Sequence, residues 1–502
     1  MSCQLPDDCL EEIFEFLETD KFTLYSCLLV NRLWCKISVR ILWRNTFDLI
    51  YHEKSSNIYP SILSTLIACL PDESKNLLYN NGISISPPTS KPLLFNYASF
   101  FKTLTILGIS RMIASVLKDK LSLISKDKNS LVVNEIIKMF ANQIPSLKKL
   151  NYYHLYYYNN HKFNISFPQF PGMSDLSELC CKSDLPSDFF YQLTQICHNL
   201  QSISVDFSSS IKDELKELIS SQNNLKNFNL SAFNGGSWND IIPVITEHSH
   251  TITKLKFRSN DNNSSFSFIS SFSNLQELLF SFLDGVLEDF RRLQYVNFPK
   301  LQILKIPYKR PKPEYVINFL ENNGKNLKKF YTSENDRDLS LSIAQFCPNL
   351  TSLFIVFNDG ELDILKTILI NCQYLESIKI RCGKDCLSEK EVLETVAKYS
   401  PNNFRELKIH HHITCSDASP NDLESFFMCW ERRTPKKLLS FIIIGELPFT
   451  IIGSMEYHLY CGYNSFEALK VIEKYKNLGT IKFVTKSEGE VDEKEEDQYR
   501  HS

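Results

Sequence analysis

Segments 274–280 (NLQELLF), 300–306 (KLQILKI) and 349–355 (NLTSLFI) share one pattern: a leucine followed three and five residues later by apolar residues. Such alternation predicts a short β-strand with one buried face. The pattern occurs thirteen times, about 28 residues apart on average. We call its first residues the anchors; they are Leu147, Leu176, Leu200, Leu225, Ile252, Leu275, Leu301, Leu327, Leu350, Leu375, Phe404, Leu438 and Leu478.

Between the anchors lie segments with helical spacing, such as 211–221 and 389–400. One strand and one helix per repeat predict an α/β solenoid in which each repeat buries its apolar face on its neighbours. The repeats resemble leucine-rich repeats, and Cys197, Cys347 and Cys372, three positions before an anchor, resemble the cysteine-containing subtype. The resemblance implies a horseshoe of about 13 repeats.

The beginning of the chain predicts three short helices. In 5–17 (LPDDCLEEIFEFL), four apolar residues recur at helical spacing, with Asp7 and Asp8 as candidate N-caps. Two further helices follow within about fifty residues, which is too small a unit to bury all of its apolar side chains. Surplus apolar surface on a small helical module usually marks a binding partner.

The segment 5–17 followed by 28–34 (LLVNRLW) resembles an F-box, although Cys9 and Asn31 depart from its commonest residues. In that family the motif docks on Skp1, the adaptor that joins an F-box protein to a cullin-RING ubiquitin ligase. The resemblance implies adaptor contacts by Leu5, Pro6, Leu10, Ile13, Phe14, Leu17, Val30, Arg32 and Trp34. The alternative is a helical cap whose apolar face covers the next domain.

The predicted organisation has four parts. Residues 1–48 form the F-box helical module, and residues 49–130 form a helical linker or N-terminal cap region. Residues 131–485 form the solenoid, and residues 486–502 are an acidic tail without apolar pattern, which is typical of disorder.

Outward positions of the predicted strands are rich in lysine and arginine, eleven against four acidic residues. Such a concave surface favours an acidic or phosphorylated protein segment as ligand. Alternatively, these lysines only keep exposed strand positions solvated. The candidate substrate-binding residues are Lys254, Lys256, Arg258, Lys305, Lys329, Lys379 and Arg381.

Composition restricts the remaining classes of function. The chain of 502 residues has a net charge of −3, so we expect no nucleic-acid or membrane partner. Fifteen cysteines without a bridge framework, and no signal-peptide pattern, favour a cytoplasmic and/or nuclear location. The longest apolar stretch, 438–453, is interrupted by Glu446 and Pro448 and predicts a buried strand.

Neither a phosphate-binding loop nor a nucleophile elbow occurs, so we expect no enzyme and no cofactor. The histidines of 410–415 (HHHITC) lack a ligand set with zinc-finger spacing, and we favour strand or surface histidines over a metal site. The sequence thus predicts a substrate-recognition adaptor of a Skp1–cullin–F-box ligase. The alternative is a Skp1-binding scaffold outside a ligase, or a leucine-rich-repeat interaction module.

Overall fold

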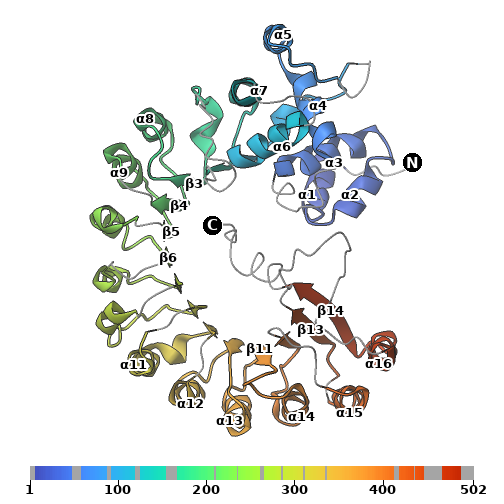
Figure 1. The fold of residues 1–502 in the computed structure, drawn as a ribbon, viewed down its shortest axis with the longest axis vertical. Helices are drawn as coiled ribbons and strands as arrows, with labels where there is room; N and C mark the ends of the chain where they lie inside the picture. The colour runs from blue at the N-terminus through green and yellow to red at the C-terminus, as the bar shows by residue number, and fades with distance from the viewer. Residues whose placement is uncertain are drawn as a thin grey trace. The chain divides into compact units, whose positions relative to one another are not determined.

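The computed structural model describes residues 6–47, 58–86, 92–118, 125–153, 167–207, 211–233, 236–259, 265–283, 287–308, 311–333, 336–411, 418–434, 436–445 and 466–487. The chain divides into two compact units, residues 1–227 and 228–502. Figure 1 labels many of the helices and strands of both units. Leu5 and almost all of the predicted acidic tail lie outside the described residues.

The first unit opens with the three predicted helices, α1 (Asp7–Glu15), α2 (Lys21–Cys27) and α3 (Arg32–Arg44). Asp7 and Asp8 do not cap α1, contrary to prediction, because the N-cap is Pro6 and its side chain makes no capping bond. The two aspartates lie instead in the first turn, where their charge is favoured by the helix dipole.

Side-chain caps begin the next two helices. Asp20 accepts a hydrogen bond from the backbone N–H of Thr23 at 3.1 Å, and Asn31 accepts one from that of Trp34 at 2.9 Å. Asn31, which departs from the commonest F-box residue, therefore has a local role in starting α3.

Further helices precede the repeats, as expected for the predicted helical linker or cap region. They are α4 (Tyr59–Cys69), α5 (Asp72–Asn80), the 3₁₀ segment η3 (Tyr97–Phe100), α6 (Ile106–Lys118) and α7 (Ser125–Gln143). Buried rings join this region, with centroids 5.1 Å apart for Phe47 and Phe101 and 4.9 Å apart for Phe101 and Phe140. These helices therefore have an aromatic core of their own.

All thirteen predicted strands are present. They are β2 (Lys149–Tyr152), β3 (Glu178–Lys182), β4 (Ser202–Phe207), β5 (Asn227–Ala232), β6 (Lys254–Ser259), β7 (Glu277–Phe282), β8 (Ile303–Ile306), β9 (Lys329–Thr332), β10 (Ser352–Ile355), β11 (Ser377–Cys382), β12 (Glu406–His411), β13 (Leu439–Gly445) and β14 (Ile481–Ser487). One strand without an anchor, β1 (Thr103–Thr105), precedes them and pairs in parallel with β2. Within the described residues the fourteen strands form one parallel sheet in chain order, which confirms the α/β solenoid.

The last anchor was assigned wrongly, whereas Leu438 keeps the predicted frame, because Phe441, three residues after it, pairs with Leu407, three residues after Phe404. The eleven earlier anchors are buried, whereas Leu438 and Leu478 are 54% and 56% exposed. In the register of β13 and β14, Phe441 lies opposite Phe483, so the β14 pattern begins two residues later than predicted. Because side chains alternate between faces, a two-residue shift leaves each predicted residue on the same face of the sheet.

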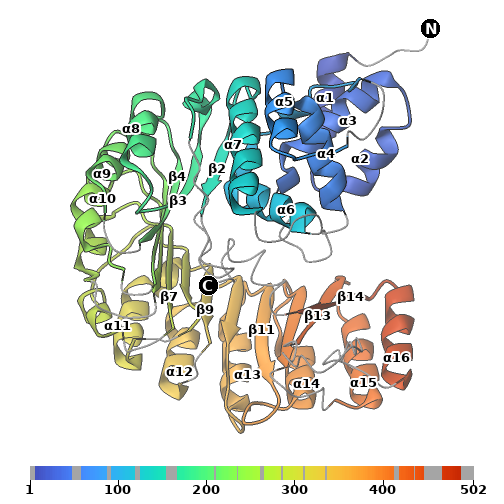
Figure 2. The ribbon, with the colours of Figure 1, turned by 45° about the horizontal axis from the view of Figure 1, so that its top comes forward.

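Helices connect the strands, and Figure 2 shows those of the second unit along one face of its strands. In the first unit they are α8 (Ser187–Ile196) and α9 (Asp213–Ser220). In the second unit they are α10 (Ile242–Glu247), α11 (Pro313–Asn323), α12 (Arg337–Phe346), α13 (Leu362–Asn371), α14 (Glu389–Tyr399), α15 (Pro420–Glu431) and α16 (Phe466–Asn477).

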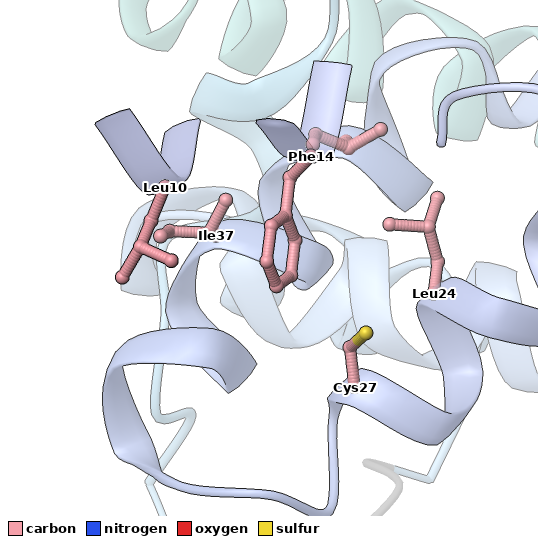
Figure 3. Close-up of a cluster of buried hydrophobic side chains, with 6 residues drawn as sticks. Leu10, Phe14, Leu24, Cys27 and Ile37 are labelled. Atoms are coloured by element: carbon pink, nitrogen blue, oxygen red, sulfur yellow. The ribbon is translucent and has the colours of Figure 1, made fainter. Parts of the chain in front are cut away.

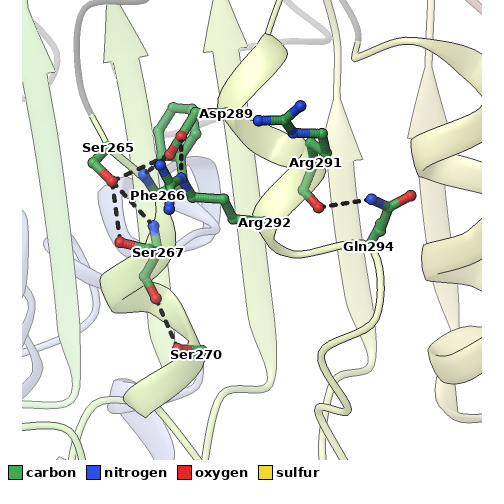
Figure 4. Close-up of polar contacts among 8 residues, drawn as sticks. All are labelled: Ser265, Phe266, Ser267, Ser270, Asp289, Arg291, Arg292 and Gln294. Carbon is green, nitrogen blue, oxygen red and sulfur yellow. Dashed lines mark hydrogen bonds and ion pairs between the residues drawn. The ribbon is translucent and has the colours of Figure 1, made fainter.

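Two repeats have short 3₁₀ segments where a helix was expected, η6 (Ser267–Ser271) and η7 (Glu288–Arg292). Asp289 joins them by accepting a hydrogen bond from the backbone N–H of Phe266 at 2.6 Å, while pairing with Arg292 at 2.6 Å (Figure 4). The buried Phe266 ring lies 5.3 Å from that of Phe280. Large rings thus fill these short repeats without a full helix.

Three cysteines end helices in the buried core, as the cysteine-containing repeat implies. The thiol of Cys197 donates to the carbonyl oxygen of Met173 at 3.1 Å, and that of Cys372 donates to the carbonyl oxygen of Cys347 at 3.4 Å. Burial raises the pKa of both Cys197 and Cys372 to about 12. These thiols are therefore protonated at neutral pH and weakly nucleophilic.

We predict that iodoacetamide at pH 8 will alkylate the exposed Cys9 and Cys429 of the native protein but spare Cys197 and Cys372. The raised pKa leaves little thiolate at that pH, and burial excludes the reagent. Peptide mass spectrometry measures the modified fraction, with urea-unfolded protein as the control in which all four thiols react. Equal alkylation of all four in the native protein would contradict the assignment.

A buried amide links consecutive repeats at the end of α11. Asn323 is fully buried; its Nδ2 donates to the carbonyl oxygens of Val296 and Phe319 at 2.9 and 3.1 Å. Its Oδ1 accepts from the backbone N–H of Phe298 at 2.7 Å. The side chain thus joins the end of α11 to two backbone groups of the irregular connection that precedes it, the carbonyl of Val296 and the N–H of Phe298.

We expect Asn323→Leu to destabilise the protein by about 2–4 kcal/mol, because three buried hydrogen bonds lose their partner. The neighbouring Asn322→Leu is the matched control, since Asn322 is exposed. Urea unfolding gives the change in midpoint, and hydrogen exchange at the Phe298 amide reports the local effect. Equal midpoints for the two variants would refute the role of the buried amide.

Candidate partner-binding surfaces

The three N-terminal helices enclose a small apolar core (Figure 3). Its buried residues are Leu10, Phe14, Leu24, Cys27, Ile37 and Ile41, with Leu17, Leu33, Trp34 and Leu42 packed against them. The rings of Phe14 and Trp34 meet edge to face, with centroids 5.1 Å apart. The core therefore depends on residues of the two segments that resemble an F-box.

Two ion pairs hold α1 against α3. Arg40 pairs with Glu11 at 2.6 Å, and Arg44 binds both carboxylate oxygens of Glu15. The hydrogen bond from Arg44 lowers the pKa of Glu15, and the same bond raises the pKa of Arg44. This two-pronged geometry is the strongest that an arginine and a carboxylate adopt, so it orients the two helices.

The structure separates the predicted adaptor-binding residues into two groups. Leu10 and Phe14, for which the resemblance implies adaptor contacts, are 6% and 2% exposed, so both side chains are part of the helical core. Leu17 and Trp34 are partly buried against that core. The exposed residues, whose side chains are accessible to a partner, are Pro6, Ile13, Val30 and Arg32.

Four exposed apolar residues of the same module were missed by the sequence analysis. Phe16 and Leu29 are 86% and 89% exposed, and Phe22 and Tyr25 are 88% and 55% exposed. Phe22 and Tyr25 are three positions apart and so lie on one side of α2. The spacing of Phe22 and Tyr25 could have predicted their exposure. Neither residue occupies the positions of Leu24 and Cys27, which form the buried stripe of α2.

A second candidate surface is the sheet face of the second unit that lies opposite the helices, which we call the inner face. Parallel pairing aligns its residues into rows that cross the strands. The first row contains Lys254, Glu277 and Lys329. The central row contains Lys256, Leu279, Lys305, Tyr331, Phe354, Lys379, Lys408, Ile442 and Val484.

The structure therefore distributes the seven predicted substrate residues over different rows. Lys256, Lys305 and Lys379 share the central row, whereas Lys254 and Lys329 lie in the first row. Arg258 and Arg381 lie two residues beyond the central row, on β6 and β11. Lys254 pairs with Glu277 at 3.7 Å, which partly neutralises the first row.

Aromatic rings lie between two lysines of the central row. The Nζ atom of Lys305 lies 5.2 Å from the ring centroid of Tyr331, and that of Lys379 lies 4.4 Å from the centroid of Phe354. Since Tyr331 and Phe354 are strand neighbours, β8 to β11 present lysine, tyrosine, phenylalanine and lysine in sequence. Such a surface can contact both acidic and apolar side chains.

Histidines of the segment 410–415 lie partly in the core. His410 and His411 are buried on β12, and the Nε2 atom of His411 is 3.3 Å from a carboxylate oxygen of Glu389; His412 and Cys415 are outside the described residues. In the described part of the chain, no three histidine, cysteine or acidic side chains are arranged to hold a metal ion. Across the same ranges, no helix has the length and apolar character needed to cross a membrane.

Comparison with known proteins finds a family model that matches the N-terminal helices. Residues 2–48 match the family model described as F-box-like. The chain therefore has an F-box-like domain at its N-terminus, followed by a leucine-rich-repeat solenoid. No curated protein matches the sequence.

Three solved structures are similar at low identity. The leucine-rich repeat-containing protein LegL7 from Legionella pneumophila is 13% identical over 60% of this chain and 91% of its own, with a TM-score of 0.34. The Rad7 and Elc1 complex from yeast gives 12% identity, 80% and 92% coverage, and a TM-score of 0.37. A Bacteroides fragilis protein gives 15% identity, 40% and 74% coverage, and a TM-score of 0.28.

We predict opposite outcomes for two phenylalanines of the F-box-like domain. Phe14→Ala should destabilise its three helices by about 3–5 kcal/mol, because it leaves a cavity in the core. Phe16→Ala should change their stability by less than about 0.5 kcal/mol, because that ring is exposed. Hydrogen exchange of α1 to α3 in the full-length protein measures both effects. A larger effect for Phe16 would contradict the described core.

Proposed function

We propose that the protein is a non-catalytic substrate-recognition adaptor of a Skp1–cullin–F-box ubiquitin ligase. The match of residues 2–48 to the F-box-like family supports this proposal most directly. In that role the F-box-like domain binds a Skp1-type adaptor, the leucine-rich repeats bind a protein substrate, and the associated ligase performs the chemistry.

The exposed apolar residues of the F-box-like domain support a protein partner. Ile13 is 48% exposed although it lies on the helix that supplies Leu10 and Phe14 to the core. Val30 and Leu29 lie in the connection between α2 and α3 and are 56% and 89% exposed. Burial of such side chains contributes about 25 cal/mol for each Å² of apolar area removed from water. We propose that Leu10, Phe14, Leu17 and Trp34 support this surface, that Pro6, Ile13, Val30 and Arg32 contact the adaptor, and that Leu5 joins them.

On the inner face, we propose that the substrate contacts Lys254, Lys256, Arg258, Lys305, Lys329, Lys379 and Arg381. The positive charge of the central row, together with its two rings, favours an acidic or phosphorylated protein segment. The sequence of the substrate does not follow from these positions, because a solenoid tolerates many side chains on its inner face.

The adaptor assignment predicts that the double variant Ile13→Asp, Leu29→Asp will lose Skp1 binding at least about a hundredfold, because two charges enter an apolar interface. Both side chains are exposed, so the helical core should persist. Co-purification with Skp1 and titration calorimetry give the affinity. Binding by the double variant at wild-type affinity would remove the proposed interface, and absence of binding by the wild type would remove the assignment.

Ile370→Asp, Leu94→Asp is the matched control. Ile370 is 45% exposed and Leu94 is 85% exposed, close to the values for Ile13 and Leu29, and both lie outside the F-box-like domain. This control should bind Skp1 as the wild type does. Detection of a cullin in the purified complex then separates a ligase subunit from the alternative, a Skp1-binding scaffold or interaction module outside a ligase.

A further inference from the structure

Strand β14 is the last strand of the sheet in the part of the chain that the structure describes. It pairs with β13 over its whole length, from Ile481 opposite Leu439 to Ser487 opposite Gly445. No described strand pairs with its other edge, which we call the open edge. A row of backbone N–H and C=O groups along such an edge is a template for an added strand.

Side-chain exposure shows that the last repeat is less covered than the repeat before it. Phe441 and Ile443 of β13 are buried, whereas their partners in β14 are half-buried in the case of Phe483 and exposed in the case of Thr485. Leu469 of α16, the helix that contacts β14, is 48% exposed. The open edge is therefore accessible to a partner.

The inner face of β14 presents a symmetrical pattern of charge. Val484 belongs to the central row, so Lys482 and Lys486, two residues to either side, lie on the same face. Lys482 is exposed and Lys486 is half-buried, and within the described ranges neither ammonium group belongs to an ion pair. They differ in this from Lys408 of the central row, which pairs with Glu406 at 3.3 Å.

The two lysines determine which kind of strand fits the open edge. If two copies of this chain paired their β14 strands antiparallel with full overlap, Lys482 would lie opposite Lys486 at both ends of the pair, which is destabilising. Acidic side chains at the same two positions would instead form two cross-strand charge pairs, with an apolar side chain between them opposite Val484. This pattern reads the same in both directions, so it fits a parallel or an antiparallel strand.

We infer that the open edge of β14 binds an extended segment of a partner protein that has two acidic residues four positions apart and an apolar residue midway between them. Main-chain hydrogen bonds along the edge provide affinity, and Lys482 and Lys486 provide selectivity. β-Branched residues at the remaining positions suit a surface beside Phe483 and Thr485. The inference does not rest on the proposed function, because neither the F-box-like domain nor a ligase takes part in it.

Fluorescence anisotropy with the full-length protein tests the charge selectivity. The probe is the labelled peptide Thr-Glu-Val-Val-Thr-Glu-Thr, and a second probe has lysine in place of both glutamates. We expect Lys482→Glu, Lys486→Glu to weaken binding of the acidic peptide at least about tenfold and to strengthen binding of the basic peptide by a similar factor, because two attractive pairs exchange with two repulsive ones. Equal affinities of the two proteins for either peptide, or no binding of the acidic peptide to the wild type at about 1 mM, would overturn the inference.

Lys366→Glu, Lys470→Glu is the matched control. It makes the same change in net charge at two exposed lysines, which lie on the helices α13 and α16. This control should bind both peptides as the wild type does, and circular dichroism verifies that each protein is folded. An equal loss of acidic-peptide binding in the control would show that net charge alone attracts the peptide, and would refute the site.

Backbone measurements distinguish strand addition from ion pairing alone. At saturating acidic peptide, hydrogen exchange in 481–487 should slow at least about tenfold, because edge amides gain hydrogen bonds, while exchange in α16 should not change. Methylation of alternate backbone nitrogens of the peptide blocks donation along one of its edges. Of two peptides methylated along opposite edges, one should bind like the unmodified peptide and the other should not. Equal binding by both, or unchanged exchange in β14, would contradict strand addition.

Discussion

Parallel pairing between successive strands is the constraint on which the structure depends. A single strand of four to seven residues with one helix cannot bury its own apolar face, so each repeat is stable only against its neighbours. Each of the eleven buried anchors, from Leu147 to Phe404, precedes one of these strands. The anchors give successive strands the same position relative to the apolar core. Amide side chains such as Asn323 then satisfy backbone groups where one repeat meets the next.

The same pairing determines the chemistry of the inner face. Residues that are about 25 positions apart in sequence become strand neighbours, so Lys305 and Lys379 come to flank Tyr331 and Phe354. Alternation along each strand assigns Leu255 and Phe257 to the core and Lys256 to the other face. A row that combines lysines and aromatic rings therefore arises without any local motif.

Much of the fold could be predicted because its signals are local and repeated. The strands follow from the leucine pattern, and the first three helices follow from apolar spacing. The predictions failed where local patterns were ambiguous: Leu478 matches the pattern, but the pairing of Phe441 with Phe483 selects another frame for β14. Likewise, Leu10 and Ile13 belong to one predicted apolar stripe, yet packing of α3 buries Leu10 and leaves Ile13 exposed.

The sequence by itself determined the class of architecture, the number of anchored strands and the F-box-like motif, because periodic burial and capping act over a few residues. Only the tertiary structure decided which apolar side chains remain available to a partner and which lysines share a row. Those properties depend on contacts between segments tens of residues apart, such as Glu15 with Arg44 and Phe354 with Lys379. Spacing along the chain does not predict these contacts, because many registers and helix orientations satisfy the same local pattern.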